Sequence, residues 1–475
     1  MNALTSESLI SDLSDYVGSR MGMSFPRNKW RELEKKISLA AGTFGFPDAG
    51  SCIQWILSSR TDRRQLEMLA SCLTVGETFF FREGAGLHAL VEQAFPEIVR
   101  AHARGDKRIR IWSAGCSTGE EAYSLAMMAS EYHGLHGWDV SILATDINQS
   151  SLRKAEAGVY TEWSFRGVAP GIREKFFHKV DRSSFEVLPA LKSMVTFGHL
   201  NLIDDVYPAL LNNTNAVDLI LCRNVFMYFT PECVQRVISK FQQSLLAQGW
   251  LLVSPVEAPL IDRSMFTPLL HTGAVLHRKA PRKPASIAVP FMPAVSRKPL
   301  PPAPSAAKIR PAAAYQRAME LYAAADYDGA IQVLLDVTAR PPARAPAFLL
   351  LSRAYANKGM LAESEAWCTR AIAADTMNAA SRYLLALIRI EQHRPEEATS
   401  ALRKALYLEP DLAVAHFTLA NLYRRQGKKR EAERHVRNAL LVLRSIPSER
   451  ELPESEGMTA GMLIELIAAT HVEGR

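Results

Sequence analysis

The chain has 475 residues, of which 48% are hydrophobic and 22% are charged, and its formal net charge is +7. At roughly 100–200 residues per domain, this length predicts two to four folded units with ordinary soluble cores. No stretch reaches the ~20 consecutive apolar residues that span a bilayer, and the N-terminus lacks the pattern of a secretory signal, so we expect no membrane insertion. The six cysteines show no CxxC spacing, which argues against a metal site or a disulfide framework and favours a cytoplasmic location.

Residues 1–90 are predicted to form a helical N-terminal subdomain. Apolar side chains recur there every three or four residues, which is the period of an amphipathic helix. The two clearest series are Leu9, Leu13 and Val17, and then Trp30, Leu33, Ile37 and Ala41.

The pattern changes in residues 91–277, where short apolar runs alternate with helical segments. The runs read IRIWSAG, VSILATD, VTFGHLNL, AVDLILCRN and GWLLVSP. Alternation of this kind predicts an α/β fold in which helices cover both faces of a parallel sheet. Ligands of such sheets bind at the carboxyl ends of the strands, so the residues that follow each run are candidates for a binding site.

The first run is followed by a turn from Gly115 to Gly119 that leads into a helix. Glycines at such a turn let a ligand approach the backbone closely. The GxxxG spacing differs from the GxGxxG of dinucleotide sites and has no phosphate-loop lysine, which disfavours NAD and ATP. Glu120 and Glu121 open the helix, where a carboxylate either stabilises the helix dipole or accepts from a cationic ammonium group.

Polar residues also follow two later runs. Asp146 ends the second one, and an acid at this position either binds the hydroxyl pair of a ribose or caps the next helix. Arg223 and Asn224 follow a strongly apolar run further along the chain. Upstream of the sheet, an aromatic triplet ends at Arg82. This triplet is either a piece of core beside a solvated arginine or part of the same site.

Residues 278–310 are predicted to be a Pro-rich basic linker. Proline fixes φ and lacks a backbone donor, so its density here favours an extended chain. Part of the excess positive charge lies in this linker. Because we find no basic face with exposed aromatic residues elsewhere, we expect no nucleic-acid partner.

A repeat follows in residues 311–446. Ala330, Ser364, Ala398 and Ala432 are each 34 residues apart, and two further sets of small residues keep the same step. Small residues recur where two helices cross closely, and this period is the signature of tetratricopeptide repeats. We predict an all-α solenoid of four repeats, at 311–344, 345–378, 379–412 and 413–446.

The repeats are expected to offer a surface for a protein or peptide partner. A terminal repeat exposes an apolar face that needs a cap. Residues 447–475 contain an apolar helix near Met458–Ala469, and we expect this helix to supply that cap.

Five segments occur in a characteristic order in the first part of the chain, namely ETFFFRE, WSAGCSTGEEAYSLA, ATDI, HLNL and CRNVFMYF. In this combination the chain closely resembles the CheR-type chemoreceptor methyltransferases over roughly residues 5–277. The resemblance implies a Rossmann-like domain that binds S-adenosylmethionine, preceded by the all-α subdomain. It also implies a small β-subdomain, which would fall near residues 176–195.

The reaction implied by the resemblance is methyl transfer from S-adenosylmethionine to glutamate side chains, with S-adenosylhomocysteine as product. The substrate would be the cytoplasmic methylation helices of a membrane chemoreceptor. Arg82 and Tyr228 would lie nearest the transferred methyl group as catalytic residues. Glu120 would hold the amino group of the cofactor, and Asp146 would hold its ribose. The implied cofactor-binding set is Thr78, Arg82, Glu120, Asp146, Asn201, Leu202, Arg223 and Asn224, and no metal is implied.

Three features depart from the family pattern. Gly76 stands where the family often has asparagine, and Ser254-Pro255-Val256-Glu257 differs from the usual Gly-x-Ser-Glu. The β-subdomain is short and has no glycine-rich loop, so we hypothesise that the receptor is recognised without a C-terminal tail peptide. Two alternative functions stay open, which are a degenerate cofactor sensor with the repeats as its scaffold, and a methyltransferase for another protein or a small carboxylate.

A basic cluster on or beside the second helix fits an acidic substrate. A receptor's methylation region is acidic, so these cations could steer its docking. The alternative is an ordinary solvated face, because Glu32 and Glu34 are interleaved. The cluster consists of Arg27, Lys29, Arg31, Lys35 and Lys36.

Overall fold

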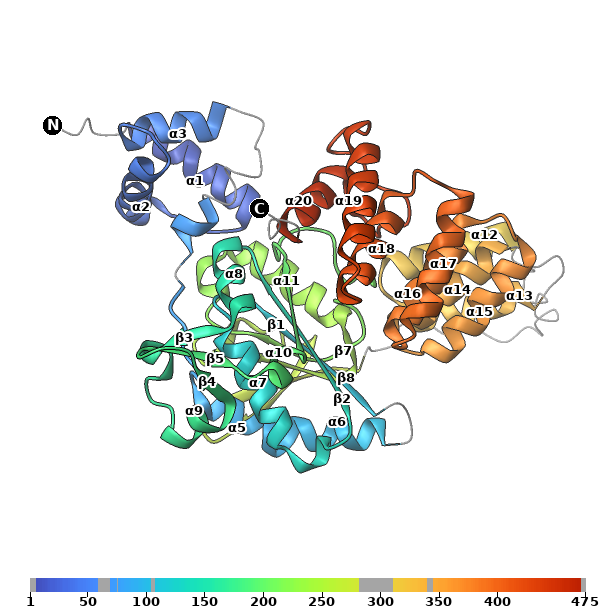
Figure 1. Ribbon diagram of the computed structural model, residues 1–475, viewed down its shortest axis with the longest axis horizontal. Helices are drawn as coiled ribbons and strands as arrows, with labels where there is room; N and C mark the ends of the chain where they lie inside the picture. The colour runs from blue at the N-terminus through green and yellow to red at the C-terminus, as the bar shows by residue number, and fades with distance from the viewer. Residues whose placement is uncertain are drawn as a thin grey trace, which may run out of the picture. The chain divides into compact units, whose positions relative to one another are not determined.

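The computed structural model describes residues 6–58, 69–74, 76–103, 107–281, 311–339 and 345–470. The chain forms two compact units, whose elements are labelled in Figure 1. The first unit comprises residues 1–280 together with 446–475, and the second comprises residues 281–445. None of the helices within the described ranges is long and apolar enough to cross a membrane.

The first unit opens with a helical bundle that includes α1 (Glu7–Met21), α2 (Trp30–Thr43) and α3 (Ala49–Ser58), with η1 (Arg27–Lys29) before α2. The hydroxyl of Ser6 caps α1 by accepting from the backbone N–H of Leu9, as serine does at many helix starts. The apolar positions predicted from the 3–4 spacing, Leu13, Val17, Leu33 and Ile37 among them, pack into one buried cluster.

The last fully buried residue of this helical cluster is Leu73. Phe80, Leu87 and Leu90 belong instead to the core of the α/β domain. The helical subdomain therefore ends before the predicted boundary at residue 90, because α5 (Gly84–Ala89) packs against the sheet strand β10.

The α/β domain is built on a seven-stranded sheet with the order β6-β2-β1-β7-β8-β10-β9. The strands from β6 to β8 in that order are parallel, and β10 is antiparallel to both of its neighbours. Every residue of β7 is buried, as expected for a central strand with both faces covered. The strands are β1 (Arg108–Ala114), β2 (Asp139–Asp146), β6 (Val195–His199), β7 (Val217–Cys222), β8 (Leu245–Val253), β9 (Phe266–His271) and β10 (Ala274–Lys279).

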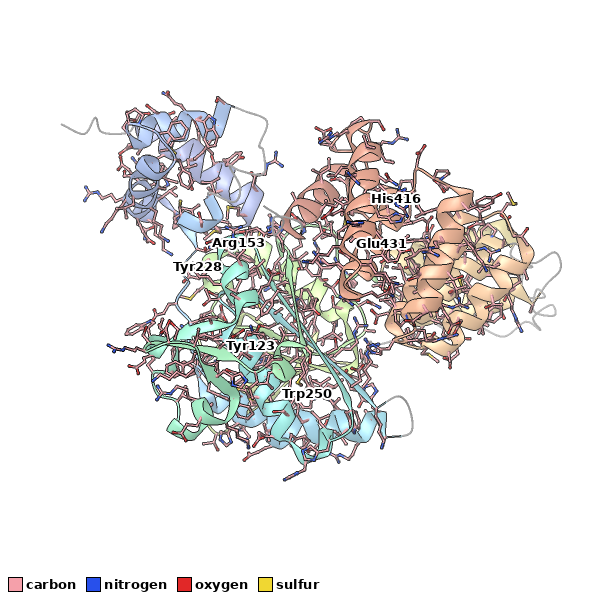
Figure 2. The ribbon with its side chains drawn as sticks, in the orientation of Figure 1. Tyr123, Arg153, Tyr228, Trp250, His416 and Glu431 are labelled. Carbon is pink, nitrogen blue, oxygen red and sulfur yellow. The ribbon has the colours of Figure 1, made fainter. Side chains whose placement is uncertain are left out.

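Alternate residues of the strands feed two cores, one on each face of the sheet. Ile111 and Leu219 face the core that contains α7, whereas Trp112 and Ile220 face the core that contains α11. Figure 2 labels Tyr123 and Trp250, which both lie in the first of these cores. The flanking helices are η2 (Leu90–Ala94), α6 (Phe95–His102), α7 (Glu120–Glu131), η3 (His133–Leu135), α8 (Gln149–Ala157), η5 (Phe226–Tyr228), α11 (Pro231–Ser244) and η6 (Ala258–Leu260).

A second sheet of three strands, in the order β3-β5-β4, corresponds to the small β-subdomain. It begins earlier than the predicted range of 176–195, and Val195 already belongs to β6 of the main sheet. Phe80 of the upstream motif stacks on Phe165 with ring centroids 5.1 Å apart and meets Phe177 edge-on, so this part of the aromatic triplet is core. The elements are β3 (Val159–Thr161), η4 (Glu162–Phe165), α9 (Pro170–Phe176), β4 (Phe177–Lys179), β5 (Ser184–Val187) and α10 (Pro189–Lys192).

The second unit consists of helix pairs that fall within the four predicted repeat ranges. Small residues at the predicted crossings are buried, with Ala330, Ser364 and Ala398 at 0% exposure, which lets paired helices approach closely. Strand β10 runs to Lys279, two residues into the predicted linker, and residues 282–310 lie outside the described residues. The helices are α12 (Pro311–Ala323), α13 (Tyr327–Thr338), α14 (Ala345–Asn357), α15 (Leu361–Ala374), α16 (Ala379–Glu391), α17 (Pro395–Leu408), α18 (Ala413–Arg425) and α19 (Lys429–Arg444).

The C-terminal segment differs from its prediction as a repeat cap. Residues 446–470, which include α20 (Ala460–Thr470), group with the α/β domain and not with the repeats. Met462 packs against the core on the α11 face of the sheet. Leu463 and Ile467 of α20 are 0% and 1% exposed, so the helix is buried as the sequence requires, and it belongs to the unit of the α/β domain.

Candidate functional site

The candidate site lies where the parallel strands end. Gly115 follows β1 with φ of 83°, and Gly119 precedes α7 with φ of 91°. A Cβ atom on Gly115 would lie 2.5 Å from Val225 Cγ2, and one on Gly119 would lie 2.8 Å from the Cβ of Ala155. Both glycines are therefore required by the tight turn and by the side chains that pack against it. The predicted close approach of a ligand at this turn stays a prediction.

Two cavities open beside this turn and share the wall residues Gly115, Ser117, Asn224 and Tyr228. The first cavity is lined mainly by apolar groups together with a few polar ones. Its lining includes Met21, Met23, Thr74, Gly76, Asp146, Ile147, Ser151, Leu200, Asn201, Leu202, Val225 and Phe229. The second cavity is more polar, and its lining includes Glu77, Thr78, Arg82, Cys116, Glu121, Ser124, Arg223 and Met227.

Asp146 lies in the first cavity at the end of β2. One carboxylate oxygen accepts from the backbone N–H of Ser117 and the other from that of Asn148, both at 2.8 Å. Burial raises the pKa of the Asp146 carboxyl, and these backbone donors oppose the rise. The carboxylate therefore ties the glycine-rich turn to the start of α8 while one side of it faces the cavity.

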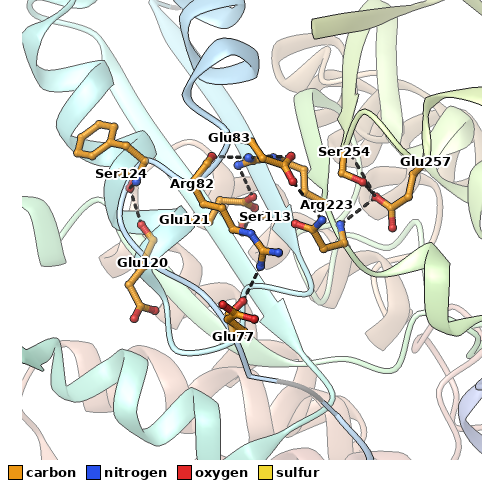
Figure 3. Close-up of polar contacts among 12 residues, drawn as sticks. Glu77, Arg82, Glu83, Ser113, Glu120, Glu121, Ser124, Arg223, Ser254 and Glu257 are labelled. Atoms are coloured by element: carbon orange, nitrogen blue, oxygen red, sulfur yellow. Dashed lines mark hydrogen bonds and ion pairs between the residues drawn. The ribbon is translucent and has the colours of Figure 1, made fainter. Parts of the chain in front are cut away.

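Arg223 forms the centre of a buried ion network in the second cavity. Its guanidinium lies 3.2 Å from Glu121 Oε2 and 3.2 Å from Glu83 Oε2, and it also donates to the backbone oxygen of Arg82 (Figure 3). The Arg223 side chain is only 4% exposed. Such a buried, multiply paired guanidinium holds the two carboxylates and the Arg82 backbone in place.

The two glutamates at the start of α7 point to different places. Glu121 lines the second cavity, and its carboxylate accepts from Ser113 Oγ at 2.7 Å. The Glu120 carboxylate turns away from this network (Figure 3) and accepts from Thr118 Oγ1 at 2.6 Å and Ser164 Oγ at 2.9 Å. Burial raises the pKa of the Glu120 carboxyl. Glu121, and not the predicted Glu120, is therefore the carboxylate that lines the cavity. The two side chains point in different directions because successive residues of a helix are roughly 100° apart.

Tyr228 and Arg82 both line the second cavity. Arg82 donates to the backbone oxygen of Glu77 at 2.5 Å, which holds its guanidinium over this wall. Burial raises the pKa of the Tyr228 hydroxyl, and the nearby charge of Arg82 opposes the rise. The backbone oxygen of Tyr228, which is labelled in Figure 2, accepts from the N–H of Ser24 at 2.7 Å. The Tyr228 ring also packs against the helical bundle, which therefore supports this part of the wall.

Sequence reasoning missed two supporting carboxylates. Glu83 accepts from the side-chain amide of Asn224 at 3.2 Å as well as from Arg223. Glu257 is 1% exposed, and it accepts from the backbone N–H of Asn224 at 2.8 Å and of Met227 at 3.3 Å. Asn224 has a positive φ of 60°, and Glu257 secures this turn. Neither contact has a periodic signal in the sequence.

Seven of the eight predicted cofactor-binding residues line the two cavities, and Glu120 is the exception within the described part of the chain. The sequence matches the family "CheR methyltransferase, SAM binding domain" over residues 76–268 and "Tetratricopeptide repeat" over residues 379–412. A "Chemotaxis protein methyltransferase" of Borreliella burgdorferi is 33% identical over 251 residues, covering 52% of this chain and 87% of that protein. The chain belongs to the CheR methyltransferase family.

A longer relative combines both parts of the chain. "Probable biofilm formation methyltransferase WspC" of Pseudomonas putida is 30% identical over 409 residues, covering 83% of this chain and 89% of that protein. "Chemotaxis protein methyltransferase 1" of Pseudomonas aeruginosa is 32% identical over 242 residues, covering 50% of this chain and 85% of that protein. The chain is a WspC-like CheR methyltransferase with tetratricopeptide repeats.

S-adenosylmethionine is the methyl donor of this CheR domain, and the donor set of the cavities fits it. The hydroxyl of Ser117 is buried on the shared wall and has no hydrogen-bond partner among the described residues. Carboxylates lie in both cavities, and the first cavity has an apolar wall at Leu200 and Leu202. A ligand with a cationic amino-acid end, a ribose and a flat base matches this distribution of groups.

Proposed function

We propose that this enzyme methylates glutamate side chains of a membrane chemoreceptor and thereby forms methyl esters that adapt its signalling. The relatives named as chemotaxis protein methyltransferases support this assignment. The observation that carries it is the chemistry of the second cavity. Its described lining offers arginine and hydroxyl groups, contains no histidine or lysine, and has no carboxylate without an ion-pair partner.

The lining of that cavity favours a substrate that is already ionised. Its two carboxylates, Glu77 and Glu121, are paired with Arg166 and Arg223. Burial raises the pKa of the Cys116 thiol well above its ordinary value, so this thiol stays protonated. A lysine amine would need a base to remove its proton, whereas a glutamate with a pKa of about 4.3 is ionised at neutral pH. A carboxylate is thus the nucleophile that the site can use directly.

When bound, S-adenosylmethionine supplies an electrophilic methyl group on a sulfonium. We propose that Arg82 and the Tyr228 hydroxyl orient the substrate carboxylate toward that group and strip it of water. The remaining predicted residues, Thr78, Asp146, Asn201, Leu202, Arg223 and Asn224, would hold the cofactor, with Glu121 in place of Glu120 for its amino group. Arg223 would act mainly through Glu121, because its own donors are already engaged.

The substrate surface is proposed to include the basic cluster of the helical bundle. Lys29, Arg31 and Lys35 are exposed, whereas the Lys36 ammonium donates to the backbone oxygen of Leu73 at 2.8 Å. Exposed cations attract the acidic methylation helices of a receptor. Such a substrate would place the enzyme in the cytoplasm.

The β-subdomain supports recognition without a receptor tail peptide. Strands β4 and β5 are joined by a short turn in which Asp181 accepts from the backbone N–H groups of Ser183 at 2.7 Å and Ser184 at 2.8 Å. Because these backbone donors are paired within the turn itself, the turn provides no loop that could hold an added strand. We expect no saturable binding of an isolated receptor C-terminal peptide in calorimetry, and micromolar binding would contradict this proposal.

The repeats are proposed to bind an acidic protein partner. A groove on the third repeat, which Thr376 at the end of the second repeat also lines, contains Arg382, Glu396, Thr399, Ser400, Arg403, Lys404, Tyr407 and Leu408. Tyr407 is 86% exposed there. Replacing Arg382 and Lys404 with glutamate should slow methylation of receptors in native membranes and leave methylation of a purified receptor fragment unchanged. If the variant methylates at the wild-type rate in both assays, this groove does not bind the partner.

The main proposal is tested by incubating the full chain with methyl-labelled S-adenosylmethionine and receptor-containing membranes, followed by mild alkali. A carboxyl methyl ester releases its label as methanol, and we expect this result. Label that stays on protein after alkali would indicate nitrogen methylation. Cofactor binding without any transfer of label would favour the degenerate sensor.

A further inference from the structure

The chain returns to the methyltransferase domain after the repeats. Its last described segment, residues 446–470, is an ordered part of that domain and not a tail. Glu451 and Thr459 form an antiparallel bridge, and the N–H of Ala460 donates to the backbone oxygen of Arg450 at 2.9 Å. Leu463 and Ile467 of α20 are 0% and 1% exposed. The domain is therefore assembled from two stretches of chain with the repeats inserted between them.

This segment contacts one particular loop, residues 200–210, which we call the cofactor loop. The backbone N–H of Leu210 donates to Glu456 Oε2 at 3.0 Å. Gly457 has φ of 99°, and a Cβ atom there would lie 2.9 Å from the backbone oxygen of Asp205. Met462 packs against the cluster that contains Leu202 and Val206.

The first three residues of the cofactor loop form part of the wall of the first cavity. Leu200, Asn201 and Leu202 line that cavity. The loop is fixed at its start, where Leu200 N–H donates to the Asp146 backbone oxygen at 3.1 Å and the Asn201 amide donates to the Arg20 backbone oxygen at 2.8 Å. The hydroxyl of Tyr207 donates to the Leu202 backbone oxygen at 2.6 Å, which links the two halves of the loop.

We infer that Glu456 and Gly457 are positioning residues for the cofactor cavity. Glu456 holds the far end of the cofactor loop through Leu210, and Gly457 lets the C-terminal segment pack against Asp205. Since the bond to Tyr207 connects this end to Leu202, loss of the C-terminal contact loosens the cavity wall. The inference rests on the proposed placement of S-adenosylmethionine in this cavity.

The test compares Glu456→Ala, Glu456→Gln and Gly457→Ala in the full chain. Binding of S-adenosylhomocysteine is measured by calorimetry, and KM and kcat are measured with saturating protein substrate. We expect Glu456→Ala to raise the Kd and the KM for the cofactor by about five- to tenfold with kcat unchanged, because a hydrogen bond to a charged acceptor is lost. Glu456→Gln keeps an accepting oxygen and should restore near-wild-type binding. Gly457→Ala should behave like Glu456→Ala, because its Cβ displaces the loop.

Glu433→Ala is the matched control, since Glu433 is exposed on α19 in the other unit. Wild-type Kd values in both Glu456→Ala and Gly457→Ala would overturn the inference, as would a Kd that rises only in proportion to a loss of folded protein. A wild-type chain that binds no S-adenosylhomocysteine would overturn the cofactor site itself. Wild-type binding with unaffected variants would remove only the role of the C-terminal segment.

Discussion

At the residue scale, the two neighbouring glutamates at the start of α7 have different partners and are expected to differ in their effect on cofactor binding. Glu121 faces the cavity beside Arg223, whereas Glu120 is bonded to Thr118 and Ser164. We expect Glu121→Gln to weaken binding of S-adenosylmethionine at least about tenfold, because the carboxylate that we propose for its cationic amino group is lost. The isosteric Glu120→Gln should change the Kd by less than about threefold. Calorimetry on both variants checks this, and a larger effect at Glu120 would restore the assignment made from sequence.

The Tyr228 hydroxyl is predicted to act on the methyl-transfer step and not on cofactor affinity. Tyr228→Phe keeps the ring that packs against the helical bundle and removes only the oxygen on the cavity wall. We expect kcat to fall about ten- to a hundredfold with an unchanged Kd for S-adenosylhomocysteine, as for a lost orienting contact. Tyr132→Phe, in the core beside Phe95, is the control. An unchanged kcat in Tyr228→Phe would assign orientation of the substrate to Arg82 alone.

At the element scale, the fourth repeat contains a buried histidine pair between α18 and α19. His416 Nε2 donates to the backbone oxygen of Pro410 at 3.0 Å, so its Nδ1 accepts from His435 Nδ1 at 2.9 Å. This arrangement excludes protonation of both rings at once, because two Nδ1–H donors would then face each other. Burial lowers the pKa of His416, and burial together with His416 and Arg434 lowers the pKa of His435 to about 4.

The histidine pair predicts that the fourth repeat loses stability in acid. A histidine in the unfolded chain has a pKa near 6.5. Below that pH the unfolded state binds more protons than the folded pair, so acid favours unfolding. The contribution of His435 is complete above about pH 6.5 and falls as the pH drops toward about 4, by up to about 1.4 kcal/mol per pH unit. The lowered pKa of His416 acts in the same direction. Hydrogen exchange of α18 and α19 peptides in the full chain, corrected for intrinsic rates, measures this slope. A slope that is the same in His435→Gln would exclude the pair as its cause.

The sequence predicted elements well where a local period carries the information. The strands, the glycine-rich turn at Gly115 and the 34-residue step are all patterns of neighbouring or evenly spaced residues. The supporting contacts are not, since Ser164 meets Glu120 across 44 residues and Glu257 meets Asn224 across 33. An apolar helix face at residues 460–470 likewise indicates burial but not the surface that covers it. This is why α20 was expected on the repeats and is found with the methyltransferase domain.

At the scale of the whole molecule, the proposed acidic substrate makes the placement of exposed cations testable. The exposed cations Lys29, Arg31 and Lys35 belong to the helical bundle, in the same unit as the cavities. Lys36 is unsuitable for a test because it bonds to the backbone oxygen of Leu73 and pairs with Glu32. Charge reversal at the three exposed positions therefore changes the field without breaking a described contact.

We expect the triple variant Lys29→Glu, Arg31→Glu, Lys35→Glu to lower kcat/KM for receptor methylation about tenfold or more at low salt. The difference from wild type should shrink as ionic strength rises, since salt screens exposed charges beyond about 10 Å at 0.1 M. The matched control, Arg425→Glu, Lys429→Glu, Arg430→Glu, makes the same change in net charge at exposed positions of the fourth repeat. If both triple variants slow the reaction equally, net charge and not the helical bundle governs capture. If neither does, the receptor docks without this surface.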